Sequence, residues 1–63
     1  MKEYTVTRPI LRELLSRLGV SPLREIPHPT HKGWRAWIYD RSDPKTDLII
    51  CTYYTILQIE DER

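Results

Sequence analysis

Two stretches decide the fold: Gly33–Tyr39, which reads GWRAWIY, and Leu48–Leu57, which reads LIICTYYTIL. Both are rich in β-branched and aromatic residues, which favour strands because their side chains pack well on a pleated surface. The segment between them, residues 40–47, is polar and contains Asp43-Pro44, a pair typical of type I turns. The sequence therefore predicts a long antiparallel β-hairpin that carries most of the aromatic side chains.

The second strand of this predicted hairpin is apolar on both faces. A strand of that kind is usually buried on both sides, whereas one helix in a chain of this length covers only one face. We therefore expect a partner on the other face, and a homodimer is the simplest arrangement. An alternative stays open for residues 53–60, in which Thr52 or Thr55 caps a terminal helix that runs through Ile59 and Glu60.

The chain before the hairpin predicts a strand and two helices. Glu3–Thr7 alternates polar and apolar residues, as a short strand does. Pro9–Leu18 has helical spacing, and Gly19 ends the helix as a left-handed cap. Ser21–Ile26 predicts a second, short helix, which Pro27 ends because the residue before a proline avoids helical backbone angles. The apolar stripe of the first helix consists of Ile10, Leu11, Leu14, Leu15 and Leu18.

These elements predict an α+β fold in one small domain, residues 1–63, with the order β-α-(short α)-β-β. One leucine-striped helix packs on a small antiparallel sheet, and the acidic residues 60–63 form a frayed tail. The predicted core consists of Val6, Ile10, Leu11, Leu14, Leu15, Leu18, Val20, Leu23, Ile26, Trp34, Ala36, Ile38, Leu48, Ile50 and Ile56.

The composition excludes several classes of protein. The chain has 63 residues and one cysteine, Cys51, so no disulfide can form within it. A domain of about 60 residues buries only about 60% of the surface that its unfolded chain exposes, so it is only marginally stable on its own. No apolar run approaches the roughly 20 residues that span a bilayer, and residues 1–4, which read MKEY, lack the apolar core of a signal peptide. We therefore expect a cytoplasmic protein with no membrane partner.

The residues that could carry chemistry do not form a known catalytic or metal-binding pattern. His28 and His31 are three residues apart, but no second ligand pair stands at zinc-site spacing. Cys51 lies in the middle of a predicted strand, in an apolar run, which favours a buried, inert thiol over a nucleophile. The acidic turn lacks the spacing and the glycine of a calcium loop. We therefore predict no enzymatic activity, no cofactor and no metal.

The most unusual predicted surface is a sheet face with alternating arginine and aromatic residues. Trp, Tyr and Arg dominate the energetics of protein interfaces because they bury large areas. The sequence therefore predicts a non-catalytic binding module or regulator that acts by protein–protein contact as a homodimer. The predicted contact residues are Arg35, Trp37, Tyr39 and Tyr53.

The alternative is a small DNA- or RNA-binding regulator. The net charge is +4 over residues 1–38 and −3 over residues 39–63, for a total of +1, and such asymmetry can mark a basic face. Its nucleic-acid-binding residues would be Arg12, Arg24, Lys32, Arg35, Arg41 and Lys45.

A local resemblance supports this alternative. Residues 13–22, which read ELLSRLGVSP, resemble the first helix and the turn of a helix-turn-helix unit. The order strand, helix, turn, helix and hairpin is similar to a winged-helix core without its first helix. The resemblance implies that Arg24 faces the major groove and that Arg41 or Lys45 touches the phosphate backbone. The sequence departs from the family where Pro27 ends the second helix.

Overall fold

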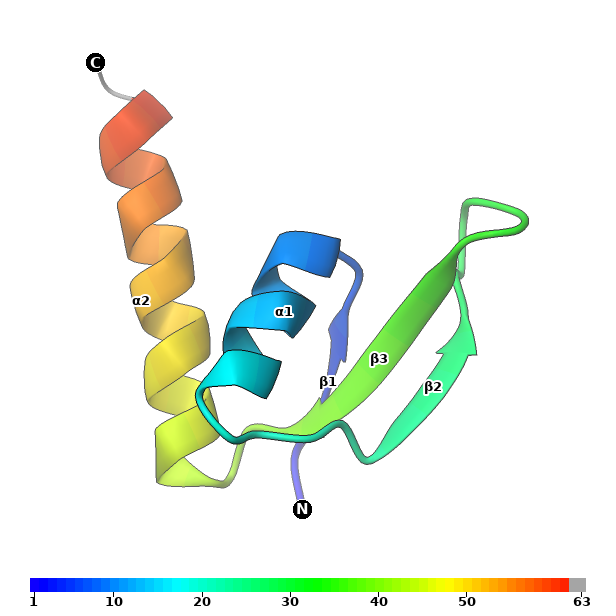
Figure 1. The fold of residues 1–63 in the computed structure, drawn as a ribbon, viewed down its shortest axis with the longest axis horizontal. Helices are drawn as coiled ribbons and strands as arrows, with labels where there is room; N and C mark the ends of the chain where they lie inside the picture. Colours follow the sequence, from blue (N-terminus) through cyan, green and yellow to red (C-terminus); the bar gives the residue numbers. More distant parts are fainter. Residues whose placement is uncertain (62–63) are drawn as a thin grey trace.

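The computed structural model describes residues 1–61, with two helices and three strands in a small α+β fold (Figure 1). The predicted frayed tail falls partly outside the described residues, because the last helix takes in residues 60 and 61 and nothing is described beyond them. In chain order the elements are β1 (Glu3–Val6), α1 (Pro9–Arg17), β2 (Arg24–Pro27), β3 (Arg35–Asp40) and α2 (Pro44–Asp61).

The sheet is antiparallel with the strand order β1-β3-β2, so β3 is the central strand (Figure 1). Trp37 of β3 lies opposite Val6 of β1 on one side and opposite Glu25 of β2 on the other. The hairpin of the fold is therefore β2–β3, joined by residues 28–34. The predicted strand, first helix and central strand at 3–7, 9–18 and 34–39 are confirmed to within one or two residues.

The predicted short helix at Ser21–Ile26 is wrong, because residues 24–27 form strand β2. The N–H of Leu23 donates to the carbonyl of Ile38 at 2.7 Å, which starts the pairing with β3. A helix of one or two turns gains little on its own, whereas the free edge of β3 offers ladder hydrogen bonds. Pro27 fits the end of an edge strand, where its missing N–H costs no ladder bond.

The predicted strand at Leu48–Leu57 is also wrong, and the alternative of a terminal helix is confirmed. That helix, α2, begins earlier than the alternative placed it, at Pro44 instead of after Thr52 or Thr55. Asp43 lies just before it, and its carboxylate accepts a hydrogen bond from the hydroxyl of Thr46 at 2.8 Å. Proline is favoured at a first helical position because its missing N–H would be unpaired there in any case.

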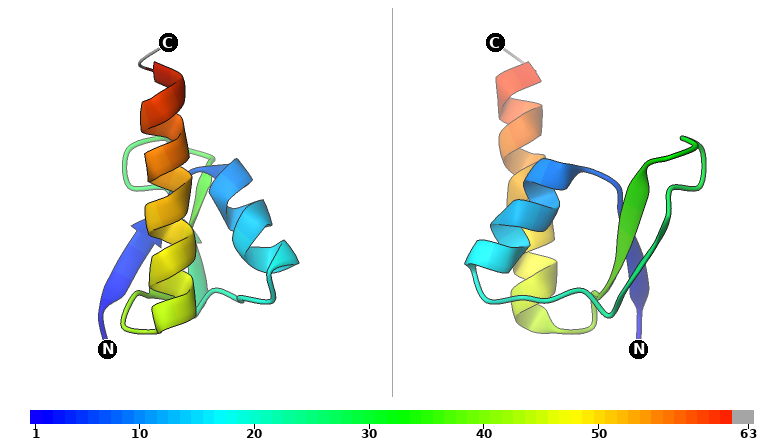
Figure 2. Two further views of the ribbon diagram at one scale, coloured as in Figure 1. Left: turned by 90° about the vertical axis from the view of Figure 1, so that its left-hand side faces the viewer. Right: turned by 45° about the vertical axis from the view of Figure 1, so that its right-hand side comes forward.

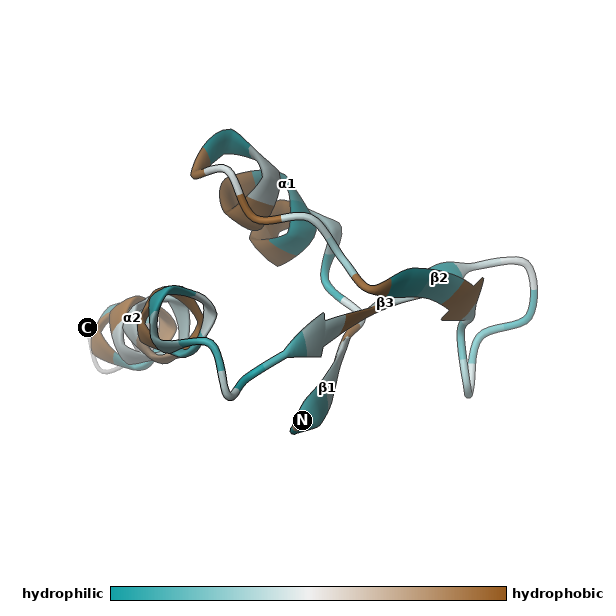
Figure 3. Cartoon of the chain, turned by 90° about the horizontal axis from the view of Figure 1, so that it is seen from below, coloured by the Kyte–Doolittle hydropathy of each residue, from teal (hydrophilic) through white to brown (hydrophobic). Residues whose placement is uncertain are grey.

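The core lies between the sheet and the two helices, which face the same side of it (Figure 3). Six of the predicted core residues are buried, and Tyr39, Ile49 and Thr46 are buried without having been predicted. Leu48 and Ile56 were predicted to be buried but are exposed, because α2 is a helix that turns them away from the sheet. The other predicted core residues that are exposed are Ile10, Leu14, Leu18, Leu23 and Trp34. The buried hydrophobic cluster consists of Val6, Leu11, Leu15, Tyr39, Ile49 and Ile50.

The opposite face of the sheet is covered by an ion pair. Ile38 is only 5% exposed although it points away from the face that carries Tyr39. Arg24 is in register with Ile38, and its guanidinium donates to both carboxylate oxygens of Glu3 on the far strand, one at 3.0 Å. The pair therefore crosses β3, and its aliphatic stems shield Ile38 from water.

We predict that Leu15→Ala and Ile10→Ala have very different effects on stability although both truncate an aliphatic side chain of α1. Leu15 is fully buried, so we expect a loss of about 3 kcal/mol from the cavity that its removal leaves. Ile10 is 72% exposed, so its loss is expected to stay within about 0.5 kcal/mol. Urea denaturation measures both, and equal losses would contradict this placement of α1.

Candidate protein-contact surface

The sheet face that the sequence predicted to be an open contact surface is covered by the helices. Tyr39 is 1% exposed and belongs to the core, so its placement on a contact surface is corrected. Tyr53 and Trp37 are half-buried against that core. The guanidinium of Arg12 lies 5.5 Å from the ring centre of Trp37. Only Arg35 is exposed, and it donates to the carboxylate of Glu25 at 2.7 Å.

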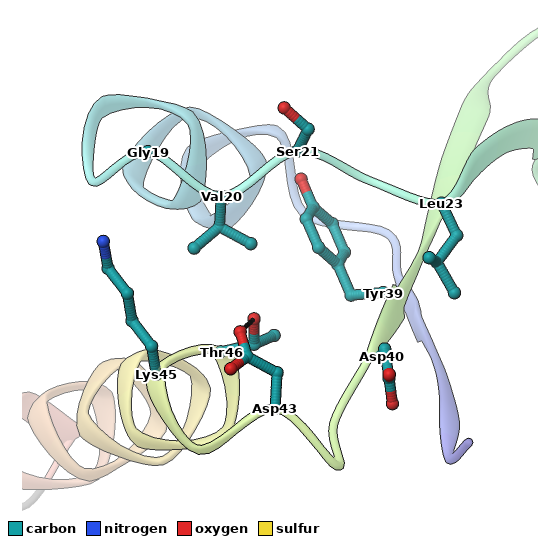
Figure 4. Close-up of a pocket in the computed structure, with 9 residues that line it drawn as sticks. All are labelled: Gly19, Val20, Ser21, Leu23, Tyr39, Asp40, Asp43, Lys45 and Thr46. Carbon is teal, nitrogen blue, oxygen red and sulfur yellow. Dashed lines mark hydrogen bonds between the residues drawn. The ribbon is translucent and has the colours of Figure 1, made fainter.

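The basic residues of the nucleic-acid alternative are distributed over separate elements. Four of the six are engaged: Arg12 on Trp37, Arg24 with Glu3, Arg35 with Glu25, and Arg41 with Asp47. Residues 21–26 form no second helix, so the predicted helix-turn-helix arrangement is wrong. Lys32 lies in the exposed β2–β3 loop, and Lys45 lies at the start of α2 with its ammonium beside Gly19 (Figure 4).

An apolar groove runs between α1 and α2. It encloses about 350 Å³, and we call it the helix groove. Leu48 is 68% exposed, Ile56 52% and Leu18 45%, which is unusual for aliphatic side chains that lie together. Its lining residues are Leu14, Leu18, Leu48, Ile49, Thr52, Tyr53 and Ile56.

The two helices that line the helix groove differ in length. α1 has 9 residues and α2 has 18, so they span about 14 Å and about 27 Å. The helices run in opposite directions, and the second half of α2 extends past α1 without another described element beside it (Figures 1 and 2). Ile59, 53% exposed, continues the apolar stripe of α2 beyond the groove.

The sequence predicted uncovered apolar surface at residues 48–57 but assigned those residues to a strand, whereas they belong to helix α2. Residues 48–57 carry apolar side chains on more than one face, and in the structure the neighbouring elements bury only some of them. As a helix it buries Ile49 and Ile50 and leaves Leu48, Thr52 and Ile56 outside, because residues four apart share one helix face.

A second hollow, of about 290 Å³, lies beside the start of α2 (Figure 4). Its charged side chains have opposite signs, with Asp40 and Asp43 on one side and Lys45 on the other. The hydroxyl of Ser42 donates to Asp40 and lowers the pKa of that carboxyl. Tyr39 also lines this hollow, and its buried hydroxyl has no hydrogen-bond partner within residues 1–61. This mixture of charges favours no single class of ligand.

The β2–β3 loop holds its histidines by hydrogen bonds and stacking. The backbone N–H groups of Thr30 and His31 donate to Nδ1 of His28, at 3.1 and 3.0 Å. The His31 ring stacks on Trp34 with 4.9 Å between their centres. Among the side chains that the structure describes, no group of three or more potential ligands gathers closely enough to hold a metal ion.

Arg41 connects β1 to α2 through three contacts. Its guanidinium donates to Asp47 at 2.8 Å, lies 3.2 Å from Sγ of Cys51, and covers the ring of Tyr4 at 4.8 Å. The thiol of Cys51 is exposed on α2, so its predicted burial in a strand is wrong. Burial of the Tyr4 ring, together with a hydrogen bond to Tyr54, raises the pKa of Tyr4 to about 12. This cluster holds the first turns of α2 against the sheet, and it is structural in character because Asp47 already neutralises the guanidinium.

Comparison of the chain with protein-family models, with curated proteins and with solved structures found no match. Within residues 1–61, neither helix combines the length and the apolar character that a membrane crossing requires. The function must therefore be argued from the surface of the chain itself.

We predict that alkaline loss of stability depends on Tyr4. An unfolded tyrosine ionises near pH 10, whereas the pKa of folded Tyr4 is raised to about 12. The stabilising contribution is therefore complete below pH 10 and lost as the pH rises to 12, because the unfolded state releases its proton first. Urea midpoints measured below and above pH 10 should fall less for Tyr4→Phe than for the natural chain.

The companion variant Tyr54→Phe removes the hydrogen bond but keeps the Tyr4 hydroxyl. Its alkaline loss is expected to lie between the other two. An identical pH dependence in all three proteins would contradict the raised pKa of Tyr4.

Proposed function

We propose that this chain is a non-catalytic binding module that acts by contact with protein through the helix groove. The observation that carries the proposal is the exposure of Leu18, Leu48 and Ile56 around one concave apolar surface. Contiguous exposed apolar patches on a soluble domain mark interaction sites, because leaving them in water forfeits the hydrophobic gain of burial.

The shape of the groove supports a protein occupant. A slot between two helices accepts a third helix or a row of aliphatic side chains, in the way that amphipathic helices dock into hydrophobic grooves. Thr52 and Tyr53 are the polar residues of the lining, and no lysine or arginine within residues 1–61 lines it. Phosphate attraction dominates nucleic-acid affinity, so this surface suits a protein better than DNA or RNA.

The nucleic-acid alternative draws less support. Its basic residues Arg24, Arg35 and Arg41 are each held by a carboxylate. Residues 21–26, which come directly after α1 and its turn, form no helix that could enter a major groove. Lys32 in the β2–β3 loop is the residue on which it would depend most.

The non-catalytic part of the proposal rests on the lining of the groove. Its side chains are aliphatic except for Thr52 and Tyr53, so among the described residues the lining offers no histidine, carboxylate, lysine or thiol for general acid–base chemistry. We further propose a cytoplasmic location, which is supported by the free, exposed thiol of Cys51, since reducing compartments preserve such thiols.

Site-specific photo-crosslinking tests the proposal. A photoreactive amino acid replaces Leu48, at the edge of the helix groove, in the cells from which the chain comes. The control position is Gln58, which is exposed on the same helix but outside the groove. We expect the photoreactive amino acid at Leu48 to give covalent protein adducts well above the level at Gln58. The same amino acid placed at Lys32, in the β2–β3 loop, should give few adducts.

Two outcomes would overturn the proposal. Equal, low yields at Leu48 and Gln58 would show that no protein occupies the groove. Nucleic-acid adducts at Lys32, with none to protein at Leu48, would favour the DNA- or RNA-binding alternative.

A further inference from the structure

We propose that the occupant of the helix groove is a second copy of this chain, paired by a two-fold axis at Thr52 that sets the two α2 helices antiparallel. This inference rests on the proposed function, because it names the partner of the same surface. It differs from the sheet-mediated dimer that the sequence predicts, since the contact is made by helices.

The first argument is the order of side chains along α2. Four residues before Thr52 stands Leu48, and four residues after it stands Ile56. In an antiparallel pair centred on Thr52, Leu48 of each copy therefore faces Ile56 of the other. Thr52 itself, which is small, lies at the crossing point and allows the helices to approach closely. An isologous interface requires this kind of self-complementary order.

The second argument is the charge at the two ends of the stripe. Lys45 lies one turn before Leu48, and Glu60 lies one turn after Ile56. The proposed axis brings Lys45 of one copy next to Glu60 of the other, and the reverse contact forms at the opposite end. Opposite charges thus meet twice, whereas a parallel pairing would place like charges together. Charge complementarity of this kind fixes the register of an interface.

The third argument is the fit between the protruding half of α2 and the groove. The groove lies where α1 contributes Leu14 and Leu18, and its lining on α2 extends from Leu48 to Ile56. The second half of α2 extends past α1 (Figure 2) and carries the exposed Ile56 and Ile59. In the antiparallel pair, the protruding half of each copy lies over the groove of the other, which gives a bundle of four helices.

The fourth argument is surface area. A compact folded monomer of 7.6 kDa is expected to expose about 4,300 Å² by the general scaling of surface with mass, whereas this chain exposes 4825 Å². The excess of about 500 Å² is a large share of the roughly 800 Å² that each partner buries in a standard interface. The excess fits the projection of α2 beyond α1.

Charge substitution at the axis gives the sharpest test, because the same residue meets itself there. In Thr52→Glu two carboxylates face each other, and in Thr52→Lys two ammonium groups do. We expect each variant alone to dimerise roughly a hundredfold more weakly than the natural chain. An equimolar mixture should recover dimers, because the heterodimer pairs Glu with Lys. Sedimentation velocity over a range of protein concentrations measures all three samples.

The matched controls are Gln58→Glu and Gln58→Lys, which place the same charges on an exposed position outside the groove and should leave dimerisation unchanged. Circular dichroism shows whether each variant keeps the fold. A natural chain that stays at 7.6 kDa at the highest concentration would overturn the dimer. Dimers that persist in both Thr52 variants would overturn the axis at Thr52.

A charge exchange tests the ends of the stripe independently. We expect Lys45→Glu and Glu60→Lys each to weaken the dimer, by roughly threefold to tenfold for such exposed pairs, and the double variant to recover most of the loss. The variant that carries both substitutions regains dimerisation only if residue 45 of one copy meets residue 60 of the other across the two-fold axis. No recovery would overturn this register.

The photo-crosslinking experiment separates the failure of this inference from that of the proposed function. Adducts at Leu48 that join two copies of the chain support both. Adducts only to other proteins would overturn the second copy as occupant while the protein-contact function stands.

Discussion

The start of α2 so soon after β3 is the constraint on which the rest of the structure depends. β3 ends at Asp40 and α2 begins at Pro44, so the chain turns from the central strand into its longest helix with only three residues between them. Asp43 and Thr46 stabilise that start, and the contacts of Arg41 with Asp47 and Tyr4 hold the first turns against the sheet. Once α2 leaves the sheet in this direction, Ile49 and Ile50 close over Tyr39, and Leu48 and Ile56 must point outward.

The described helices and strands therefore leave part of the apolar surface uncovered. One short helix packs beside the first half of α2, and the helix groove is what remains open. On the other face of the sheet the same shortage is met differently, since the Arg24–Glu3 pair covers Ile38 where a larger domain would place another helix. The exposed ion pair contributes little as a charge interaction, but its aliphatic stems bury part of the central strand.

The spacing of apolar residues along the sequence predicted three of the five elements of this fold. Alternation and helical spacing placed β1, α1 and β3 correctly, although α1 buries only Leu11 and Leu15 of its apolar stripe. They failed at residues 24–27, where pairing with β3 overrode a capped, proline-started helical signal. They also failed at residues 48–57, where β-branched and aromatic residues favour a strand although the position directly after Asp43-Pro44 starts a helix. The excess of apolar surface was predicted, but its location was not, since that depends on which face of α2 meets the sheet.

The edges of the sheet limit how this chain can associate. β1 and β2 are the two outer strands, and each has only four residues. Pro27 also removes a backbone donor from β2, so a further strand has few groups with which to pair. Short, interrupted edges oppose strand-by-strand stacking into fibres. Growth of the sheet from copy to copy is thereby discouraged, and the apolar surface that is left exposed lies on the helices, where the proposed two-fold pairing would end at two copies.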